Sequence, residues 1–215
     1  MPRFLCAAIC ATFLSIAGLP AVLAGEQDAG VAPSDAFEIL QGGGFVFVMR
    51  HASSPHDQSA PVGLSAGCSL GEGRGLDAKG LFQARALGAL LHEKGVPILK
   101  AYTSRMCRSW DTAVLAAGGA PVEPHDAQMT TDPAAIAAFK KRIEAELAAN
   151  PGQNIILTSH SNIAPLYGAI VESDEEELPE GLISVVSPPA WNGVDGALFR
   201  ITPHIEIVSQ SVTVE

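Results

Sequence analysis

The apolar run at residues 45–49 ends directly on two cation-forming side chains, Arg50 and His51. Its β-branched and aromatic residues follow a turn of three glycines, which is the pattern of a buried strand. In open α/β sheets, ligands bind in the crevice beyond the carboxyl ends of the strands. The Arg-His pair therefore predicts an anion site at the end of a central strand, with phosphate as the leading candidate.

Strand-like and helix-like patterns alternate along the rest of the chain. Strands are predicted at 45–50, 98–103 and 154–158, with further strand-like runs at 183–186, 197–201 and 205–214. Helices are predicted at about 77–94, 108–117, 132–149 and 163–171. Asp77 and the pair Asp132-Pro133 are typical helix starts. This order predicts an α/β fold with three layers, α/β/α, around a mostly parallel central sheet.

Successive parallel strands point the same way, so their carboxyl ends share one edge of the sheet. That edge is expected to bring together Arg50, His51, Arg108 and His160. Two guanidinium groups can each hold phosphate oxygens in a forked geometry. One neutral imidazole can attack phosphorus, and the other can stabilise the charge that develops on a non-bridging oxygen.

The N-terminus has the parts of a secretory signal peptide. Arg3 precedes an apolar stretch, Pro20 breaks it, and Ala24 ends a small-residue cleavage site. The alternative is a membrane anchor, for which the apolar stretch is short. We therefore expect a signal peptide at 1–24, one domain at 25–215, and a mature protein that is periplasmic or secreted without stable membrane insertion.

The net charge and the cysteines limit which partners and cofactors the protein can bind. The formal charge of −10 argues against a nucleic-acid partner, because proteins that bind nucleic acid present a basic surface. Two cysteines outside the leader, Cys68 and Cys107, either pair in an oxidising compartment or remain separate thiols. They are too few and too far apart for a zinc site without histidine help, and no cofactor is predicted. The oligomeric state stays open.

Four segments resemble motifs of the histidine phosphatase superfamily. They are Val-Met-Arg-His-Ala at 48–52, Leu-Asp-Ala-Lys-Gly with Gln-Ala at 76–84, Tyr-Thr-Ser-Arg-Met-Cys-Arg with Thr-Ala at 102–113, and Ile-Leu-Thr-Ser-His at 156–160. Each motif alone is weak, but the four occur in the family's order and spacing over residues 45 to about 170. The resemblance implies a phosphoglycerate-mutase-like fold.

The same resemblance implies a covalent phosphohistidine and no metal. His51 would be the nucleophile, and Arg50, Arg108 and His160 would bind the phosphoryl group. Similarity to exported members of the superfamily also favours a Cys68–Cys107 bridge. Together these implications predict an exported phosphatase that hydrolyses a small-molecule or envelope phosphomonoester.

The chain departs from the family pattern at Ala52, where glycine is usual, and at Asp111, where Glu or Gln is common. The general acid is also unclear from the sequence. Asp126 is the first candidate, Glu123 the second and Glu180 the third. A missing acid would restrict the enzyme to substrates with good leaving groups, such as phosphoramidates.

Two alternatives to a phosphatase fit the same motifs. A phosphomutase needs a pocket that retains its intermediate and a cytosolic diphosphate donor, and export argues against both. A non-catalytic module that binds a phosphate ligand would keep the pocket and lack the acid.

Overall fold

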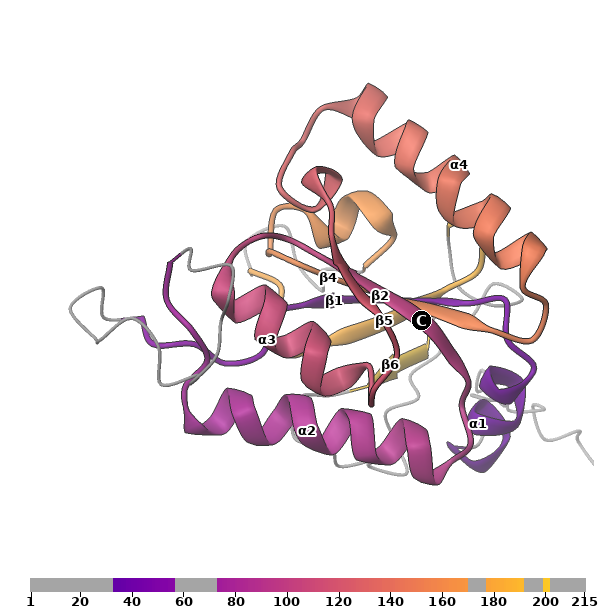
Figure 1. Cartoon of the computed structure of the whole chain (residues 1–215), viewed down its shortest axis with the longest axis horizontal. Coiled ribbons are helices and arrows are strands. Elements are labelled where there is room, and N and C mark those ends of the chain that lie inside the picture. Colours follow the sequence, from indigo (N-terminus) through magenta and orange to yellow (C-terminus); the bar gives the residue numbers. More distant parts are fainter. Residues whose placement is uncertain (1–32, 57–72, 170–176, 192–198, 202–215) are drawn as a thin grey trace, which may run out of the picture.

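Six strands form one sheet in the computed structural model, which describes residues 33–56, 73–169, 177–191 and 199–201. The strands are β1 (Val46–Arg50), β2 (Ile98–Thr103), β3 (Val122–Pro124), β4 (Asn154–Ser159), β5 (Ile183–Val186) and β6 (Phe199–Ile201). Their order across the sheet is β3-β2-β4-β1-β5-β6. β3, β2, β4 and β1 are parallel, and β5 runs antiparallel to both of its neighbours. The predicted mostly parallel sheet is confirmed (Figure 1).

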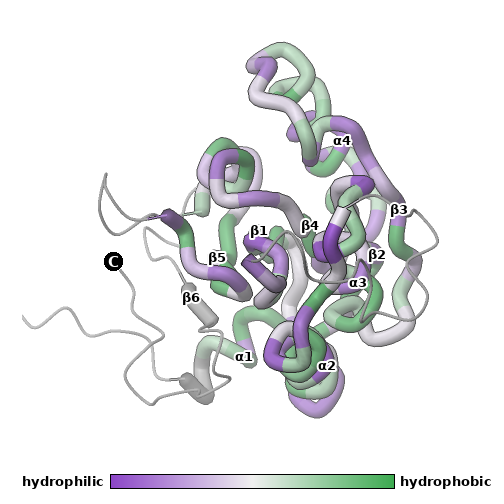
Figure 2. Tube along the Cα trace, turned by 90° about the vertical axis from the view of Figure 1, so that its left-hand side faces the viewer, coloured by the Kyte–Doolittle hydropathy of each residue, from purple (hydrophilic) through white to green (hydrophobic). Residues whose placement is uncertain are grey.

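Helices cover both faces of this sheet. The α-helices are α1 (Pro33–Gln41), α2 (Ala78–Glu93), α3 (Cys107–Ala116) and α4 (Pro133–Ala149), and the short 3-10 helices are η1 (Asp126–Gln128) and η2 (Ala164–Tyr167). Figure 2 shows α2 and α4 on opposite sides of the strands. The three-layer architecture follows from this arrangement, as the sequence predicts.

The central strands alternate their side chains between two apolar cores. Phe47, Met49 and Ile156 pack on the side of α1, α2 and α3. Val48 and Leu157 pack on the other side, against α4 and η2. Because β1 and β4 are buried on both faces, the middle of each strand is a continuous apolar run. Polar residues occupy the first position of β4 and the last positions of both strands.

Two of the predicted helix starts are present as expected. The Asp77 carboxylate accepts a hydrogen bond from the Gly80 amide at 2.7 Å and caps α2. Asp132 caps α4 in the same way by accepting from the Ala134 amide at 3.1 Å, and Pro133 occupies the first turn. These caps fix where the two helices begin relative to the preceding strands.

The predicted helix at 163–171 is wrong within the described residues. Only the four-residue 3-10 helix η2 forms there. Gly168 follows it with a φ of 96°, a left-handed conformation that ends the helix and is accessible mainly to glycine. The strand β3 and the helix α1 were not predicted. The proposed signal peptide, Cys68 and the run at 205–214 lie outside the described residues.

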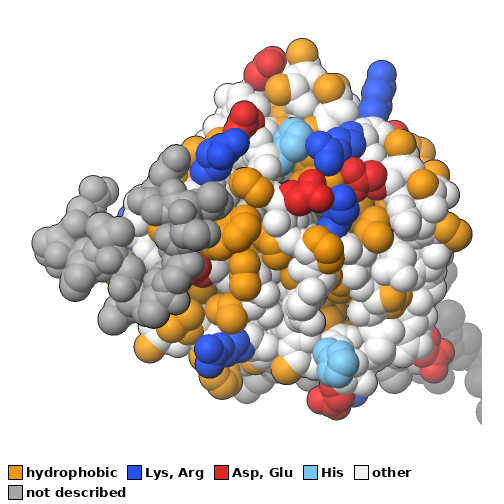
Figure 3. All heavy atoms as spheres, viewed as in Figure 1, with side chains coloured by type: hydrophobic (Ala, Val, Ile, Leu, Met, Phe, Trp, Pro, Cys, Tyr) orange, Lys and Arg blue, Asp and Glu red, His pale blue; other side chains and the backbone are white. Residues whose placement is uncertain are grey.

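A network of ion pairs joins α4 to the outer strands β2 and β3. Lys100 and Arg142 each contact both Glu123 and Glu146 within 4 Å. The Tyr102 hydroxyl donates to Glu146 at 2.6 Å. Figure 3 shows basic and acidic side chains interleaved on this face. The alternation of sign indicates a solvated structural network rather than a site for a charged ligand.

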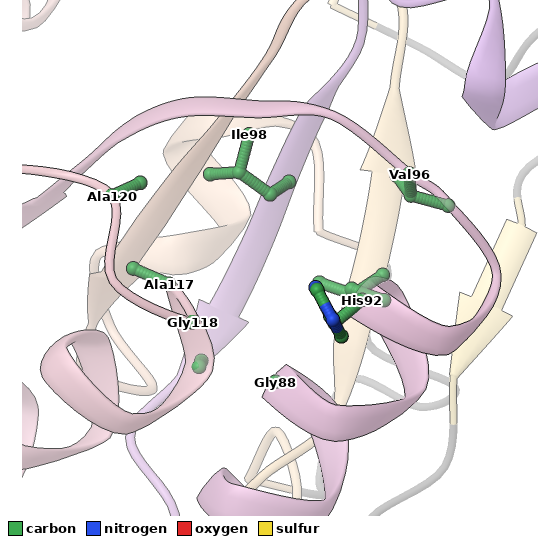
Figure 4. A pocket seen from close by; sticks show the side chains of 9 residues that line it. Gly88, His92, Val96, Ile98, Ala117, Gly118 and Ala120 are labelled. Atoms are coloured by element: carbon green, nitrogen blue, oxygen red, sulfur yellow. The ribbon is translucent and has the colours of Figure 1, made fainter.

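A small cavity of about 210 Å³ lies between the ends of α2 and α3 and the start of β2. Gly88, His92, Ile98 and Ala117 are among the residues that line it (Figure 4). Ile98 is the first residue of its strand, so the cavity is at the amino edge of the sheet, opposite the predicted anion site. In the described part of the chain, no helix has the length and apolar character needed to cross a bilayer.

Candidate active site

His51 follows the last residue of β1 and is 3% exposed. Its Nδ1 lies 2.9 Å from the carbonyl oxygen of Ala52, and its Nε2 lies 3.0 Å from Nε of Arg108. A carbonyl oxygen can only accept and a guanidinium N–H can only donate. Nδ1 therefore bears the proton and Nε2 presents its lone pair, which is the tautomer that an Nε2 nucleophile requires.

The backbone around His51 is held by several elements at once. The His51 amide donates to the Ser159 carbonyl at 3.0 Å and so continues the pairing of β1 with β4. The Ala52 amide donates to Oγ1 of Thr112 at 3.0 Å, and that hydroxyl donates to the Arg108 carbonyl at 2.6 Å. His51 and the start of α3 are thus fixed relative to one another before any ligand binds.

Arg108 lies in the first turn of α3, between the two histidines. Besides its contact with His51, its Nη2 lies 3.5 Å from Nδ1 of His160. Burial lowers the pKa of Arg108 from its usual value, and neighbouring positive charge lowers it further. A bound dianion would relieve that unfavourable environment.

His160 comes one residue after β4, and its Nε2 lies 3.0 Å from the hydroxyl oxygen of Ser104. Ser104 is fully buried, and its oxygen accepts the Met106 amide at 3.3 Å. The buried hydroxyl hydrogen needs an acceptor, and Nε2 of His160 supplies it. Nδ1 of His160 then bears the proton, and because Nη2 of Arg108 is also a donor, their 3.5 Å approach is a pair of converging donors that suits a shared anion.

Both histidines are held in the neutral form. Burial is the largest cause, and it lowers the pKa of His51 to about 2 and that of His160 to about 4. The positive charges of Arg108 and Arg50 act in the same direction on both rings. The imidazole centroids are 5.5 Å apart. The pair thus offers one neutral nucleophile and one neutral hydrogen-bond donor.

Arg50 is 7% exposed and is already in contact with carboxylates. Its Nη1 donates to the Leu178 carbonyl and lies 3.2 Å from Glu177, and its Nη2 lies 3.7 Å from Glu180. Its Nε is buried and has no hydrogen-bond partner within the described ranges. That free N–H remains available to a bound anion or to water.

Glu180 is the candidate acid that the structure brings to His51. Its Oε1 lies 3.8 Å from Nδ1 of His51. The same carboxylate accepts from the Ser54 hydroxyl at 3.1 Å and from the Ser54 amide at 3.3 Å. The Gly181 amide donates to the His51 carbonyl at 3.0 Å, which ties the residue after Glu180 to the end of β1.

Asp126 and Glu123, the first two candidates for the general acid, are directed elsewhere. The Asp126 side chain is 84% exposed and pairs with Nε of Arg105 at 3.2 Å. Glu123 belongs to the ion-pair network with Lys100 and Arg142. β3 is three strand positions from β1, which is roughly 14 Å at the usual strand spacing. No contact between Asp126 and the four site residues is present among the described residues.

The sequence predicts the four residues that the structure brings together, which are Arg50, His51, Arg108 and His160. It does not assign Ser104 or Ser54 to the site. Ser104 stands inside a quoted motif, so a signal was present, but its contact with His160 spans 56 positions of sequence. Ser54 and Glu180 are separated by 126 positions, and nothing local in the sequence links them.

The family model described as "Histidine phosphatase superfamily (branch 1)" matches residues 46–132. The match supports a relation of this part of the chain to that superfamily. The matched region includes Arg50, His51 and Arg108 and stops before His160. A search of curated proteins finds no significant match.

Three solved structures illustrate the similarity of this chain to known proteins, each at low sequence identity. A structure of the protein histidine phosphatase SixA complexed with tungstate aligns with a TM-score of 0.52 at 16% identity, over 74% of this chain and 97% of that one. The alpha-ribazole phosphatase from Shigella flexneri gives 0.40 at 22% identity, over 66% and 90%. The phosphoglycerate mutase from Thermus thermophilus gives 0.38 at 19% identity, over 67% and 94%. The first of these likenesses supports the fold and not a substrate.

No group of three or more metal-ligating side chains is found in the parts of the chain that the structure describes. The Cys68–Cys107 bridge stays a prediction because Cys68 is outside those parts.

Proposed function

We propose that this protein is an exported phosphatase that hydrolyses a phosphomonoester through a phosphohistidine on His51. The observation that supports it most is the orientation of the His51 ring. Nδ1 is bound to the Ala52 carbonyl, so Nε2 points at Arg108 with its lone pair free of a proton. A phosphoryl group bound between Arg108 and His51 would replace this hydrogen bond and meet the lone pair directly.

The reaction takes two steps in this proposal. Nε2 of His51 attacks phosphorus, and the bond from phosphorus to the ester oxygen breaks with its electron pair on that oxygen, which takes up a proton from solvent. Water then attacks the phosphohistidine, its lost proton passes to solvent, and the P–N electron pair returns to Nε2. Arg108 and the Nδ1–H of His160 stabilise the negative charge on the non-bridging oxygens in both steps.

Glu180 has a positioning role in this scheme. Both of its oxygens accept hydrogen bonds from Ser54, and it approaches the imidazole nitrogen that does not attack. A carboxylate in that place supports the Nδ1–H tautomer and the orientation of Arg50. It is less suited to protonating a leaving oxygen, which would depart on the far side of phosphorus from Nε2.

A second candidate reaction, hydrolysis of a phosphoramidate, is favoured by the placement of the carboxylates. Asp126 and Glu123 form surface ion pairs, and Glu180 is engaged by Ser54. A substrate whose leaving group needs little help from a protein acid suits such a site. SixA is described as a protein histidine phosphatase, but at 16% identity that likeness adds no weight to this reaction.

The simplest test is hydrolysis of p-nitrophenyl phosphate by wild type, His51→Ala and His92→Ala. His92 is exposed and lines the small cavity at the opposite edge of the sheet, so it is a matched control. We expect His51→Ala to lower kcat on the order of 10³-fold or more, while His92→Ala stays near wild type. Equal turnover by wild type and His51→Ala would contradict the proposal.

Two further experiments distinguish the phosphatase from a phosphomutase and from a non-catalytic binding module. A phosphomutase transfers the phosphoryl group to an acceptor hydroxyl faster than to water, so product analysis with added alcohol or phosphosugar distinguishes it. A non-catalytic module binds inorganic phosphate without turnover of any ester. Export is tested separately, by locating the mature N-terminus in cell fractions, where cleavage after Ala24 is expected.

A further inference from the structure

Arg74 is a third arginine at the candidate active site, and neither the motifs nor the proposed mechanism assign it a role. It lies in the segment just before α2, and its carbonyl oxygen accepts the Arg108 amide at 3.1 Å. Its Nε donates to the Ser54 hydroxyl at 3.1 Å. These two bonds fix Arg74 to the start of α3 on one side and to the loop after β1 on the other.

The residue before Arg74 also borders the Arg108 side chain. A Cβ atom built on Gly73 would lie 3.6 Å from Nη1 of Arg108 and 2.7 Å from Cε of Met106. Gly73 has a φ of 73°, which an L side chain rarely adopts. The lack of a side chain there lets the backbone that bears Arg74 lie close against the Arg108 guanidinium.

Arg50, Arg74 and Arg108 differ in whether a carboxylate contacts them. Arg50 contacts Glu177 and Glu180. Neither Arg74 nor Arg108 has a carboxylate within 4 Å among the described residues. Two guanidinium groups held near one another without an anion repel each other. A phosphoryl dianion would supply the two negative charges that this pair lacks.

Electrostatic effects on neighbouring groups agree with this geometry. After burial, the charge of Arg74 is the next largest cause that lowers the pKa of Arg108. The same charge also contributes to the lowered pKa of His160, after burial, Arg108 and Arg50. Arg74 therefore acts on the residue proposed to hold the phosphoryl group and on the histidine proposed to stabilise it.

We propose that Arg74 is a substrate-binding residue whose guanidinium, together with that of Arg108, holds the non-bridging oxygens of the phosphoryl group. This inference rests on the proposed function of the site. Arg50 then has a different role. Glu177 and Glu180 balance its charge, and Arg50 contributes mainly its free Nε–H to phosphate binding. The bond to Ser54 uses only Nε of Arg74, so the two Nη groups remain to bind oxygens of the phosphoryl group.

Binding of inorganic phosphate and of tungstate, measured by calorimetry, tests this role without requiring turnover. We expect Arg74→Met to weaken both affinities roughly tenfold to hundredfold, the range for loss of charge-assisted hydrogen bonds. Arg74→Lys retains the positive charge but lacks the paired N–H donors of a guanidinium, so we expect a smaller loss of affinity. Arg85→Met is the matched control, because Arg85 is exposed on α2 and makes no contact with the site, and its affinities should equal those of wild type.

Ser54→Ala separates direct binding from an indirect effect. It removes the hydroxyl that holds Arg74 and keeps the guanidinium, so the loss of phosphate affinity should be clearly smaller than in Arg74→Met. Equal losses in the two variants, or affinity of Arg74→Met close to that of wild type, would overturn the role of Arg74. Failure of wild type to bind phosphate or tungstate at all would instead overturn the proposed function itself. Melting temperatures of all variants, with and without phosphate, show whether each one is folded.

Discussion

The Ser104 hydroxyl lies 3.0 Å from Nε2 of His160 and sets which nitrogen of that ring bears the proton. Ser104 is fully buried and already accepts the Met106 amide, so its hydrogen is directed at the imidazole. Nδ1–H then faces Nη2 of Arg108 at 3.5 Å, so two donors converge on the place where an anion would accept from both. A residue outside the reacting groups thereby makes a neutral histidine into a hydrogen-bond donor for a phosphoryl oxygen.

Ser104→Ala is expected to release His160 from this tautomer. Without the hydroxyl, Nδ1 can accept from Arg108 instead, and the donor to the phosphoryl oxygen is lost in part of the population. We expect kcat/KM to fall roughly tenfold, less than for loss of a whole oxyanion donor. Nitrogen NMR of His160 should show a shift from the Nδ1–H toward the Nε2–H form.

Ser109→Ala is the control for that variant. Ser109 is also fully buried and lies in α3, but its hydroxyl has no hydrogen-bond partner within the described residues. Its removal should leave both kcat/KM and the His160 tautomer unchanged. An unchanged tautomer in Ser104→Ala would show that Ser104 does not orient the ring.

The two buried histidines should make stability depend on pH. Each has a folded pKa below the ordinary value near 6.5, at about 2 for His51 and about 4 for His160. Between those values and 6.5 the unfolded chain binds more protons, so stability rises with pH. We expect the free energy of unfolding to fall as pH is lowered from about 6.5 toward 4, by up to about 1.4 kcal/mol per pH unit for each histidine.

Urea unfolding at several pH values measures this slope. His160→Gln should make the slope shallower, because the substituted chain has one fewer group that titrates only when unfolded. His92→Gln, at an exposed position, should leave it as in wild type. A slope identical in wild type and His160→Gln would contradict the neutral buried state of His160.

Glu180→Gln distinguishes a positioning residue from a general acid. If Glu180 positions Arg50 and His51, kcat/KM should fall by the same factor, about tenfold, for an aryl phosphate and an alkyl phosphate. A general acid matters far more for the alkyl ester, whose leaving oxygen is more basic. A much larger loss with the alkyl phosphate would therefore reassign Glu180 as the acid. Asp126→Asn is the companion variant and should leave both rates near wild type.

Gly80→Ala tests the packing that supports the loop after β1. A Cβ atom at Gly80 would overlap the carbonyl oxygen of Ser53, so the helix start or the loop must move. We expect the free energy of unfolding to fall by about 1–3 kcal/mol, the usual cost of overpacking. Lys79→Ala, at the exposed neighbouring position, should change it little. Urea denaturation of the two variants provides the comparison.

The strand-end residues could be predicted because strong local patterns mark them. An apolar run that stops at Arg50-His51, and another that stops just before His160, place those residues at one edge of any parallel sheet. The start of α2 at Asp77 was equally clear, because a capping side chain is a local signal. The fold class followed from the same alternation of periodicities.

The remaining parts of the site depend on contacts between distant segments. Glu180 was the third candidate for the acid because it precedes a strand that could return to the same edge of the sheet. The antiparallel pairing of β5 with β1 brings it to His51. Arg74 and Ser54 lie on irregular segments where no periodicity predicts a contact. The helix predicted at 163–171 does not form because Gly168 adopts a left-handed conformation and ends η2 after one turn.

Trapping of a covalent intermediate is the decisive measurement for catalysis by His51. Wild type and His51→Ala are mixed with a labelled phosphomonoester, quenched in alkali within milliseconds to seconds, and analysed by peptide mass spectrometry. A phosphohistidine is stable in base and labile in acid. We expect an acid-labile, base-stable phosphoryl adduct on His51 that is absent from His51→Ala. Turnover by wild type with no adduct on His51, or with the adduct on another residue, would contradict the phosphohistidine mechanism.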